Sequence, residues 1–161
     1  MKYTTYYESS SLDLGQLGVV TLMLAFFLGS IFLFFRAKHI FIKKEQIQRG
    51  KLFSIGMGLF TGLLFISSWF SIIYEYNEIM KKYREGDAYV STGIVKNVNY
   101  IVKNGNQESF SINEYTFKYS HNEFTSFFNK TKNIGGPIKE GLPVRVTHYE
   151  GQIIKLEISE K

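Results

Sequence analysis

Two long apolar runs without a single charge dominate the first half of the chain. The first extends from Leu14 to Phe35 and the second from Leu52 to Tyr74. An α-helix rises about 1.5 Å per residue, so each run is long enough to cross the ~30 Å hydrocarbon layer of a membrane. The pattern predicts a transmembrane hairpin with helices at 14–35 and 52–74, joined by a basic loop at 36–51.

After the second run the pattern changes to that of a half-buried sheet. Residues 75–87 are predicted to form a helical stalk that ends at Gly86-Asp87. Beyond it apolar residues alternate with polar ones, as in Val98, Tyr100, Val102; Phe110, Ile112; Tyr115, Phe117, Tyr119; Val144, Val146; Leu156, Ile158. Two-residue turn signals separate these runs at Asn104-Gly105, Asn113-Glu114 and Glu150-Gly151.

These elements predict an α+β membrane protein, in which a two-helix transmembrane hairpin precedes a small all-β domain. Five or six short strands within 88–161 favour an SH3-like or OB-like barrel. Residues 1–13 are predicted to be an N-terminal tail. Aromatic residues at both outer ends of the hairpin, namely Tyr3, Tyr6, Tyr7, Trp69, Tyr74 and Tyr76, are expected to form an interfacial belt.

The positive charge is concentrated in the loop between the two helices. The chain has 19 Lys and Arg against 14 Asp and Glu, a formal charge of +5. Segment 36–51 alone carries the excess, through Arg36, Lys38, Lys43, Lys44, Arg49 and Lys51 against Glu45. Because basic loops stay on the cytoplasmic side, both termini and the β-domain are expected on the outer side of a bacterial cytoplasmic membrane. The nearly neutral β-domain argues against a nucleic-acid partner.

Small residues recur along the helices at a spacing that suits close packing. Ser54, Gly58 and Gly62 share one face of the second helix, and Ala25 and Gly29 have the same spacing on the first. The contact face could serve within the hairpin or between chains. Neither run contains Asp, Glu, Lys, Arg or His, so anchoring is a better role for the helices than ion or proton transport.

The irregular segment 120–143 is the candidate recognition surface. It contains Phe124, Phe127 and Phe128, followed by Asn129. An aromatic cluster on a loop can mark a binding site, but it can equally cap a barrel or dip into the bilayer surface. Arg145 is a second candidate, either as an anion ligand or as the partner of Glu157 on a neighbouring strand.

The sequence contains no arrangement that indicates catalysis. There is no cysteine, and the three histidines (His39, His121 and His148) lack the spacing of metal ligands. No nucleophile elbow is present, and Gly135-Gly136-Pro137 lacks the frame of a phosphate loop. We therefore expect no enzyme activity, no metal and no cofactor.

Four segments of the β-domain resemble a recurring pattern in bacterial proteins of unknown function. They are ESFSINEYTFKYS (108–120), FNKT (128–131), GGPIKEGLPVRVTHY (135–149) and IIKLEI (153–158). The resemblance covers about residues 90–158, and it implies a small β-domain beside one or two transmembrane helices, with no known activity. The chain departs from the pattern at Glu114, where glycine is usual, and at Ile134, where histidine is usual.

Together these observations predict a membrane-anchored, non-enzymatic binding or accessory protein. Its expected partners are the lipid bilayer and either another protein or a second copy of the chain. Two alternatives stay open. The chain could be a subunit of a larger membrane complex, or an immunity or inhibitor protein that acts against a toxin at the membrane.

Overall fold

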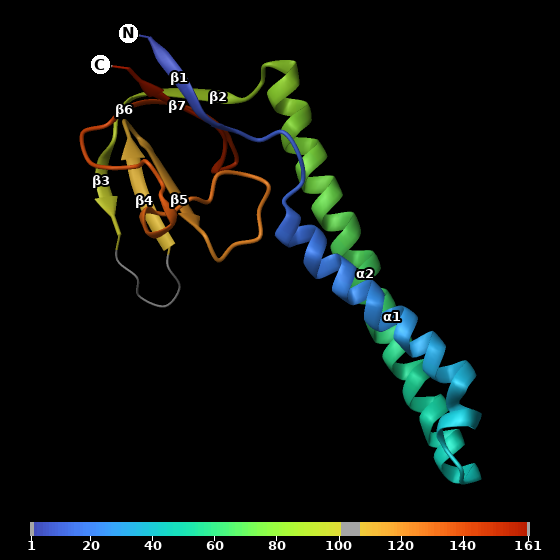
Figure 1. Cartoon of the computed structure of the whole chain (residues 1–161). Helices are drawn as coiled ribbons and strands as arrows, with labels where there is room; N and C mark the ends of the chain where they lie inside the picture. Colours follow the sequence, from blue (N-terminus) through green and yellow to red (C-terminus); the bar gives the residue numbers. More distant parts are fainter. Residues whose placement is uncertain (1, 101–106, 161) are drawn as a thin grey trace. The chain divides into compact units, whose positions relative to one another are not determined.

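The computed structural model describes residues 2–100 and 107–160, which form two compact units (Figure 1). One unit, here the β-unit, combines residues 1–13 with residues 76–161. The other, here the helical unit, comprises residues 14–75. Val102 and the predicted turn at Asn104-Gly105 lie outside the described residues.

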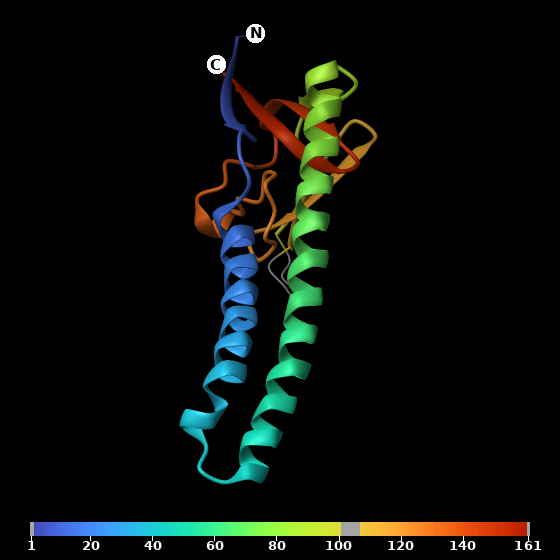
Figure 2. The same ribbon diagram turned by 90° about the vertical axis from the view of Figure 1, so that its right-hand side faces the viewer.

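The helical unit consists of α1 (Leu14–Ile40) and most of α2 (Lys44–Glu85), which run side by side (Figure 2). The predicted basic loop at 36–51 is wrong in extent, because only residues 41–43 connect the helices. Lys, Arg, Gln and Ala all have good helix propensity, so the basic residues extend both helices instead of interrupting them. Lys38 in the last turn of α1 and Glu45 in the first turn of α2 also suit the helix dipoles.

The predicted stalk is the last part of α2, which continues from the helical unit without a break. The helix ends at Glu85, and Gly86 follows it with a left-handed φ of 82°. Glycine adopts this conformation at little cost, which explains why the helix ends there.

The β-unit is a small antiparallel all-β region, as the alternation predicts. Its strands are β1 (Tyr3–Glu8), β2 (Tyr89–Ile94), β3 (Lys96–Asn99), β4 (Gln107–Ile112), β5 (Tyr115–Ser120), β6 (Pro143–Tyr149) and β7 (Gln152–Ser159). They form one sheet in the order β1-β7-β6-β2 and another in the order β3-β4-β5. Every described strand pair is antiparallel. The SH3-like or OB-like assignment stays a prediction.

Two-residue turns close both of the hairpins whose turns are described. In the β6–β7 turn, Glu150 and Gly151 have φ of 48° and 81°, the sign pattern of a type I′ turn. In the β4–β5 turn the positive φ of 53° falls on Asn113, a residue that tolerates it. Position 114 therefore does not require the glycine that is usual in the resembling pattern, and Glu114 can occupy it.

The N-terminal segment is a strand, which corrects the prediction of a tail. β1 pairs antiparallel with β7, with Thr4 opposite Ile158. The side chain of Tyr7 packs against the core, and its hydroxyl donates to the carbonyl oxygen of Ser126 at 2.9 Å. Tyr and Thr favour strands, but β1 completes its pairing only with the far end of the chain. Tyr3, Tyr6 and Tyr7 are thus strand residues, and the interfacial aromatic belt stays a prediction.

The main apolar core of the described residues is formed largely by side chains from both sheets. Its buried members are Val95, Phe110, Ile112, Phe117, Tyr119, Phe128, Ile138, Val144, Val146, Ile153 and Leu156. Val95 is the one residue between β2 and β3, at the point where the chain passes from the first sheet to the second. A smaller cluster of Ile79, Met80, Phe127 and Ile154 packs the last turns of α2, which belong to the β-unit, against other segments of the same unit.

Candidate membrane anchor and recognition surface

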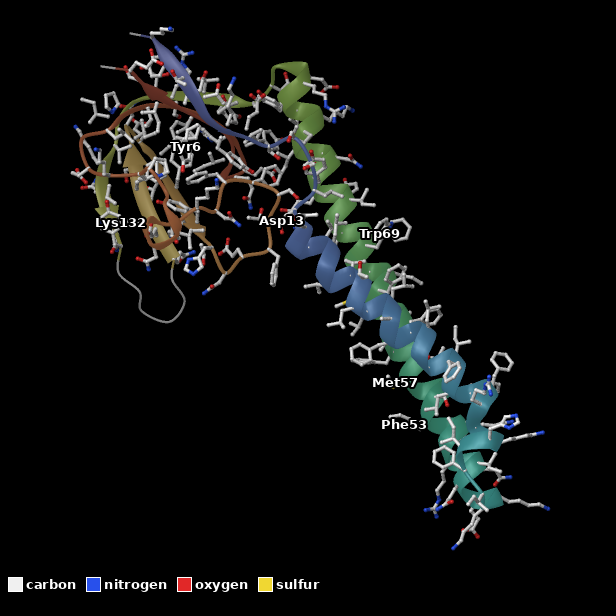
Figure 3. All side chains as sticks on the ribbon, viewed as in Figure 1. Tyr6, Asp13, Phe53, Met57, Trp69 and Lys132 are labelled. Atoms are coloured by element: carbon white, nitrogen blue, oxygen red, sulfur yellow. The ribbon has the colours of Figure 1, made fainter. Side chains whose placement is uncertain are left out.

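Large apolar side chains cover the outer surface of the helical unit. Exposed examples include Leu22, Phe26, Phe32, Phe35, Leu52, Phe53, Leu59, Phe60, Leu63 and Phe70 (Figure 3). In the most apolar stretches of α1 and α2, only 11% and 0% of the residues are buried. Both helices are long and apolar enough to cross a membrane, whereas the core helix of a soluble protein would be mostly buried.

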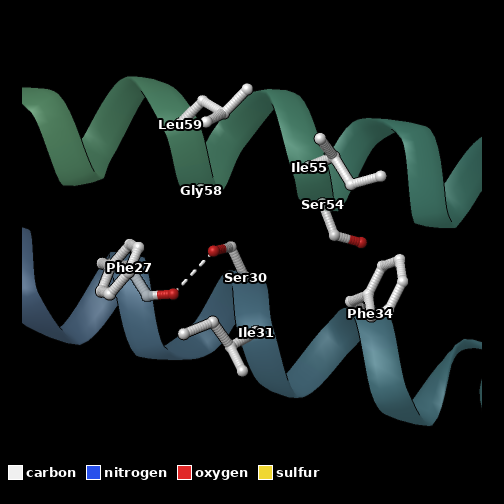
Figure 4. Close-up of a pocket in the computed structure, with 8 residues that line it drawn as sticks. All are labelled: Phe27, Ser30, Ile31, Phe34, Ser54, Ile55, Gly58 and Leu59. Carbon is white, nitrogen blue, oxygen red and sulfur yellow. Dashed lines mark hydrogen bonds between the residues drawn. The ribbon is translucent and has the colours of Figure 1, made fainter.

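The inner face of α2 carries the small residues that the sequence singled out. Ser54 is buried, and a Cβ added to Gly58 would lie 2.7 Å from the Ser30 hydroxyl oxygen (Figure 4). A Cβ at Gly62 would lie 3.1 Å from the Phe27 ring. Gly58 and Gly62 therefore face α1 within the same chain, and a side chain at either position would require Ser30 or Phe27 to move.

Ala25 and Gly29 do not lie on this contact face. Both are exposed, and a Cβ built on Gly29 would meet nothing within 4 Å. The buried positions of α1 are instead Val20, Ser30 and Ala37. Ala25 and Gly29 therefore take no part in the contact between α1 and α2, because their spacing alone does not say which face of α1 turns toward α2. A contact between chains through these residues stays a prediction.

Hydroxyl groups in the helical unit are satisfied locally. Thr21, Ser30, Ser54, Thr61 and Ser67 each donate to a backbone carbonyl three or four residues earlier in the same helix. Such back-bonding removes the cost of placing a hydroxyl in hydrocarbon, where no water can serve as a partner. The described helices thus present an apolar outer surface with no free polar group on these side chains.

In the β-unit, two of the three phenylalanines proposed as a recognition surface are core residues. Phe127 and Phe128 are only 3% and 2% exposed, while Phe124 is 63% exposed. The Phe128 ring packs against Tyr7 and Tyr119, at centroid distances of 5.5 and 5.3 Å. The prediction of a three-phenylalanine surface is wrong, because the segment folds back and buries two of them.

Residues Ser126 and Phe127 of segment 120–143 contact Asp13 and Tyr76, the residues at which the chain leaves and re-enters the β-unit. The carbonyl oxygen of Ser126 accepts hydrogen bonds from the hydroxyls of Tyr7 and Ser9, at 2.9 and 2.7 Å. The Ser126 hydroxyl oxygen accepts from the backbone N–H of Asp13, the last residue before α1. Phe127 stacks on Tyr76, the first α2 residue assigned to the β-unit.

Asn129 and Arg145 also have structural partners. The Asn129 side-chain amide donates to the carbonyl oxygen of Glu123 at 3.2 Å. A guanidinium nitrogen of Arg145 lies 3.7 Å from a carboxylate oxygen of Glu157, and the guanidinium sits over the Tyr3 ring. Of the two roles considered for Arg145, the pairing with Glu157 is the one that the structure contains.

A surface that the sequence did not indicate lies where β2 and β5 expose their tyrosines. Tyr89 is 58% and Tyr115 47% exposed, and both rings pack against the buried ring of His148, at centroid distances of 5.9 and 4.8 Å. We call Tyr89 and Tyr115 the tyrosine surface. No single stretch of sequence indicates it, because its strands belong to different sheets.

The His148 ring beneath this surface is held as a neutral core group. Its Nε2 lies 2.9 Å from the Ser91 hydroxyl oxygen, and burial lowers its pKa. A Ser–His contact is also how a nucleophile meets its base, but both residues here are buried. Among the described residues no carboxylate bonds to this imidazole and no group of metal-binding side chains gathers. The pair therefore serves packing.

Glu108 is a buried carboxylate with a structural role. It accepts hydrogen bonds from the Tyr119 hydroxyl at 2.9 Å and from the backbone N–H of Lys132 at 2.9 and 3.1 Å. Lys132 begins the short 3₁₀ helix η1 (Lys132–Ile134). Burial and the carboxylate together raise the pKa of Tyr119. Glu108 therefore fixes the chain ahead of the double glycine, where Gly136 packs so tightly that an added Cβ would lie 2.1 Å from the Lys130 carbonyl oxygen.

Comparisons with protein-family models, with curated proteins and with solved structures each found no match to this chain. The resemblance of residues 90–158 to bacterial membrane proteins of unknown function stays a prediction.

Proposed function

We propose that this chain is a non-enzymatic binding protein of the bacterial cytoplasmic membrane, anchored by α1 and α2, with its β-unit held at the membrane surface. The exposed apolar side chains along both helices support the anchor, because a surface of this kind is unfavourable in water.

The observation that carries the proposal is the pairing of β1 with β7. β1 precedes α1, and β7 follows α2. Two strands of one sheet must lie on the same side of a bilayer, so the intervening helices cross it an even number of times. A two-crossing hairpin meets that requirement. It also disfavours α1 as a cleaved signal sequence, since cleavage after α1 would remove β1 from the sheet.

The charges support an orientation for the hairpin. The connection at residues 41–43 and the adjoining helix ends carry the six basic residues that make up the excess charge. Retention of basic loops in the cytoplasm would place this end inside and the β-unit outside.

For recognition, the tyrosine surface is a better candidate than the 120–143 segment. Its rings are already held by packing on His148, so binding would order few side chains. Exposed tyrosines held in this way are common anchors of protein interfaces. The partner would therefore be a protein of the envelope that covers Tyr89 and Tyr115.

The topology can be tested by cysteine labelling, because the chain has no cysteine of its own. Single cysteines would replace the exposed residues Thr5 in β1, Glu114 in the β4–β5 turn and Gln48 in α2. Intact cells would be treated with a membrane-impermeant maleimide. We expect labelling at Thr5 and Glu114, and labelling at Gln48 only after the membrane is permeabilised.

Each other result has a defined meaning. If Thr5 and Glu114 behaved differently, β1 and β5 would lie on opposite sides and the hairpin proposal would fail. If only Gln48 were labelled, the hairpin would stand but the β-unit would face the cytoplasm. Release of the protein from membranes by alkaline washing would exclude the anchor altogether.

The alternative of a subunit recruited through small-residue helix faces is less well supported. Gly58 and Gly62 already face α1 of the same chain and are not free to receive a partner helix. No described feature favours the immunity or inhibitor alternative over a general binding role.

A further inference from the structure

An open cavity lies at the connected end of the helical unit. Its volume is about 390 Å³, and its lining is almost wholly apolar in surface. The residues around it come from α1, the connection and the first turns of α2: Leu33, Phe41, Gln46, Arg49, Gly50 and Phe53. Phe41 folds over Gly50, where an added Cβ would lie 2.6 Å from its ring.

Positive charge is concentrated at the end of the helical unit that holds this cavity. Arg36, Lys38, Lys43, Lys44, Arg49 and Lys51 all lie on the last turns of α1, on the connection or on the first turns of α2. Within residues 2–100 and 107–160, none of the six has a carboxylate oxygen within 4 Å. Glu45 stands four residues before Arg49 on α2, yet the two form no ion pair of that length.

We propose that this cavity binds an anionic phospholipid, with an acyl chain between Leu33, Phe41 and Phe53 and the phosphate at Arg49. The inference rests on the proposed membrane anchor, which brings the cavity to the cytoplasmic leaflet. An apolar pocket beside unpaired cations matches both halves of such a lipid, since the chain needs hydrocarbon walls and the phosphate needs a donor.

Arg49 is suited to this role by its position. Its guanidinium offers several donors in a planar fork that fits a phosphate, while its aliphatic stem lines the cavity. Gln46, one turn earlier on α2, also lines the cavity. The neighbouring cations strengthen the local potential without needing to touch the ligand.

The test uses the purified full chain in a mild detergent with equal amounts of phosphatidylglycerol and phosphatidylcholine that carry the same acyl chains. Native mass spectrometry counts the lipids that stay bound. We expect phosphatidylglycerol to be retained preferentially, and Arg49→Gln to weaken its retention about fivefold. Arg49→Lys should keep part of the preference, because it keeps the charge but loses the fork.

Two further variants distinguish lipid binding at this cavity from non-specific attraction by positive charge. Arg84→Gln removes the same charge from an exposed position at the other end of α2, and should change nothing. Leu33→Trp fills the cavity while keeping every cation, and should lower the retention of both lipids. Millimolar inorganic phosphate should not displace the lipid, because the cavity walls contribute to its binding.

The proposal is overturned if both lipids are retained equally, if Arg84→Gln acts like Arg49→Gln, or if inorganic phosphate alone displaces the lipid. Helix content measured by circular dichroism verifies that each variant is folded. Failure here is distinct from failure of the anchor. A protein that resists alkaline extraction but shows no lipid preference keeps the anchor and loses only this site.

Discussion

The β-unit and the helical unit use the same large apolar residues in opposite ways. The β-unit buries Phe110, Phe117 and Leu156 completely or nearly so. The helical unit leaves Phe35, Leu52 and Phe70 about 70% exposed. Average composition conceals this contrast, since the whole chain has a mean hydropathy close to zero. Where an apolar side chain points depends on the solvent around its unit, and the exposed apolar surface of the helical unit is what the proposed membrane anchor requires.

The two units also differ in the sequence separation of their side-chain hydrogen bonds. Hydroxyls such as Ser54 and Thr61 bond to their own helix, four residues back. In the β-unit, Glu108 reaches Lys132, and Tyr83 donates to the Glu8 carboxylate at 2.7 Å. The helical unit therefore contains few polar links that a substitution could break, whereas the β-unit depends on links between distant segments.

The largest effect is expected from Phe128→Ala in the β-unit. Removing this buried ring deletes its contacts with Tyr7 and Tyr119, and should lower the free energy of unfolding by about 3–5 kcal/mol. Urea unfolding of the full chain in detergent, followed by near-ultraviolet circular dichroism, measures the loss. Hydrogen exchange of peptides from β4 and β5 locates it.

Phe124→Ala is the matched control for this loss. The ring is largely exposed, so the free energy of unfolding should change by less than about 0.5 kcal/mol. Equal losses for the two variants would contradict the division of the segment into a buried part and an exposed part.

A smaller loss is expected from Glu108→Ala. The substitution leaves the Tyr119 hydroxyl and the Lys132 amide without their acceptor inside the β-unit, which should cost about 3 kcal/mol. The same unfolding measurement applies. Glu114→Ala, at an exposed turn position, should cost almost nothing, and a comparable loss there would show that general charge and not the buried contact is responsible.

In the helical unit we expect Gly58→Leu to loosen the pairing of α1 and α2 by about 1–3 kcal/mol. The new side chain would overlap the Ser30 hydroxyl, which lies 2.7 Å from a Cβ at this position. A short thiol cross-linker between cysteines at Phe27 and Gly62 reports the pairing, and its yield should fall. Gly29→Leu faces open space and should leave the yield unchanged. A fall in both variants would mean that α1 meets another helix through Gly29.

The local pattern was sufficient to predict most of the architecture. Charge-free runs identified both helices, and the period-two alternation identified β4, β5, β6 and β7 with their turns. These signals work because each depends on residues close together in the chain. The six cations at the connected end were also recognisable, although helix propensity shortened the loop around them.

Features that depend on distant contacts could not be predicted. β1 is a strand because Tyr3 lies opposite Ser159, at the other end of the chain. Phe127 and Phe128 are buried because their segment folds back onto Tyr76 and Tyr7, and nothing nearby in the sequence distinguishes them from Phe124. The tyrosine surface needs two sheets to meet around His148, so it appears only in the folded unit.

The smallest expected effect is a pH dependence of the stability of the β-unit, which the helical unit is not expected to share. Burial lowers the pKa of His148 below its usual value of 6.5, so the unfolded chain binds a proton there more readily than the folded one. The stability contributed by the neutral ring is therefore fully present above that value, and it declines as the pH falls below 6.5. The β-unit should unfold at lower urea concentration at about pH 5 than at about pH 7.5.

His148→Gln identifies the source of this pH dependence. Glutamine can still bond to Ser91 but does not titrate, so the difference between the two pH values should shrink. Glu8 cannot account for the effect in this window, because its hydrogen bond from Tyr83 lowers its pKa below 4.5 and the stability it contributes is lost only at more acidic pH. His39→Gln, at the end of α1, should leave the pH dependence of the β-unit intact. If His148→Gln retained the full difference, another group would be responsible, and the neutral ring beneath the tyrosine surface would not limit the stability of the β-unit in acid.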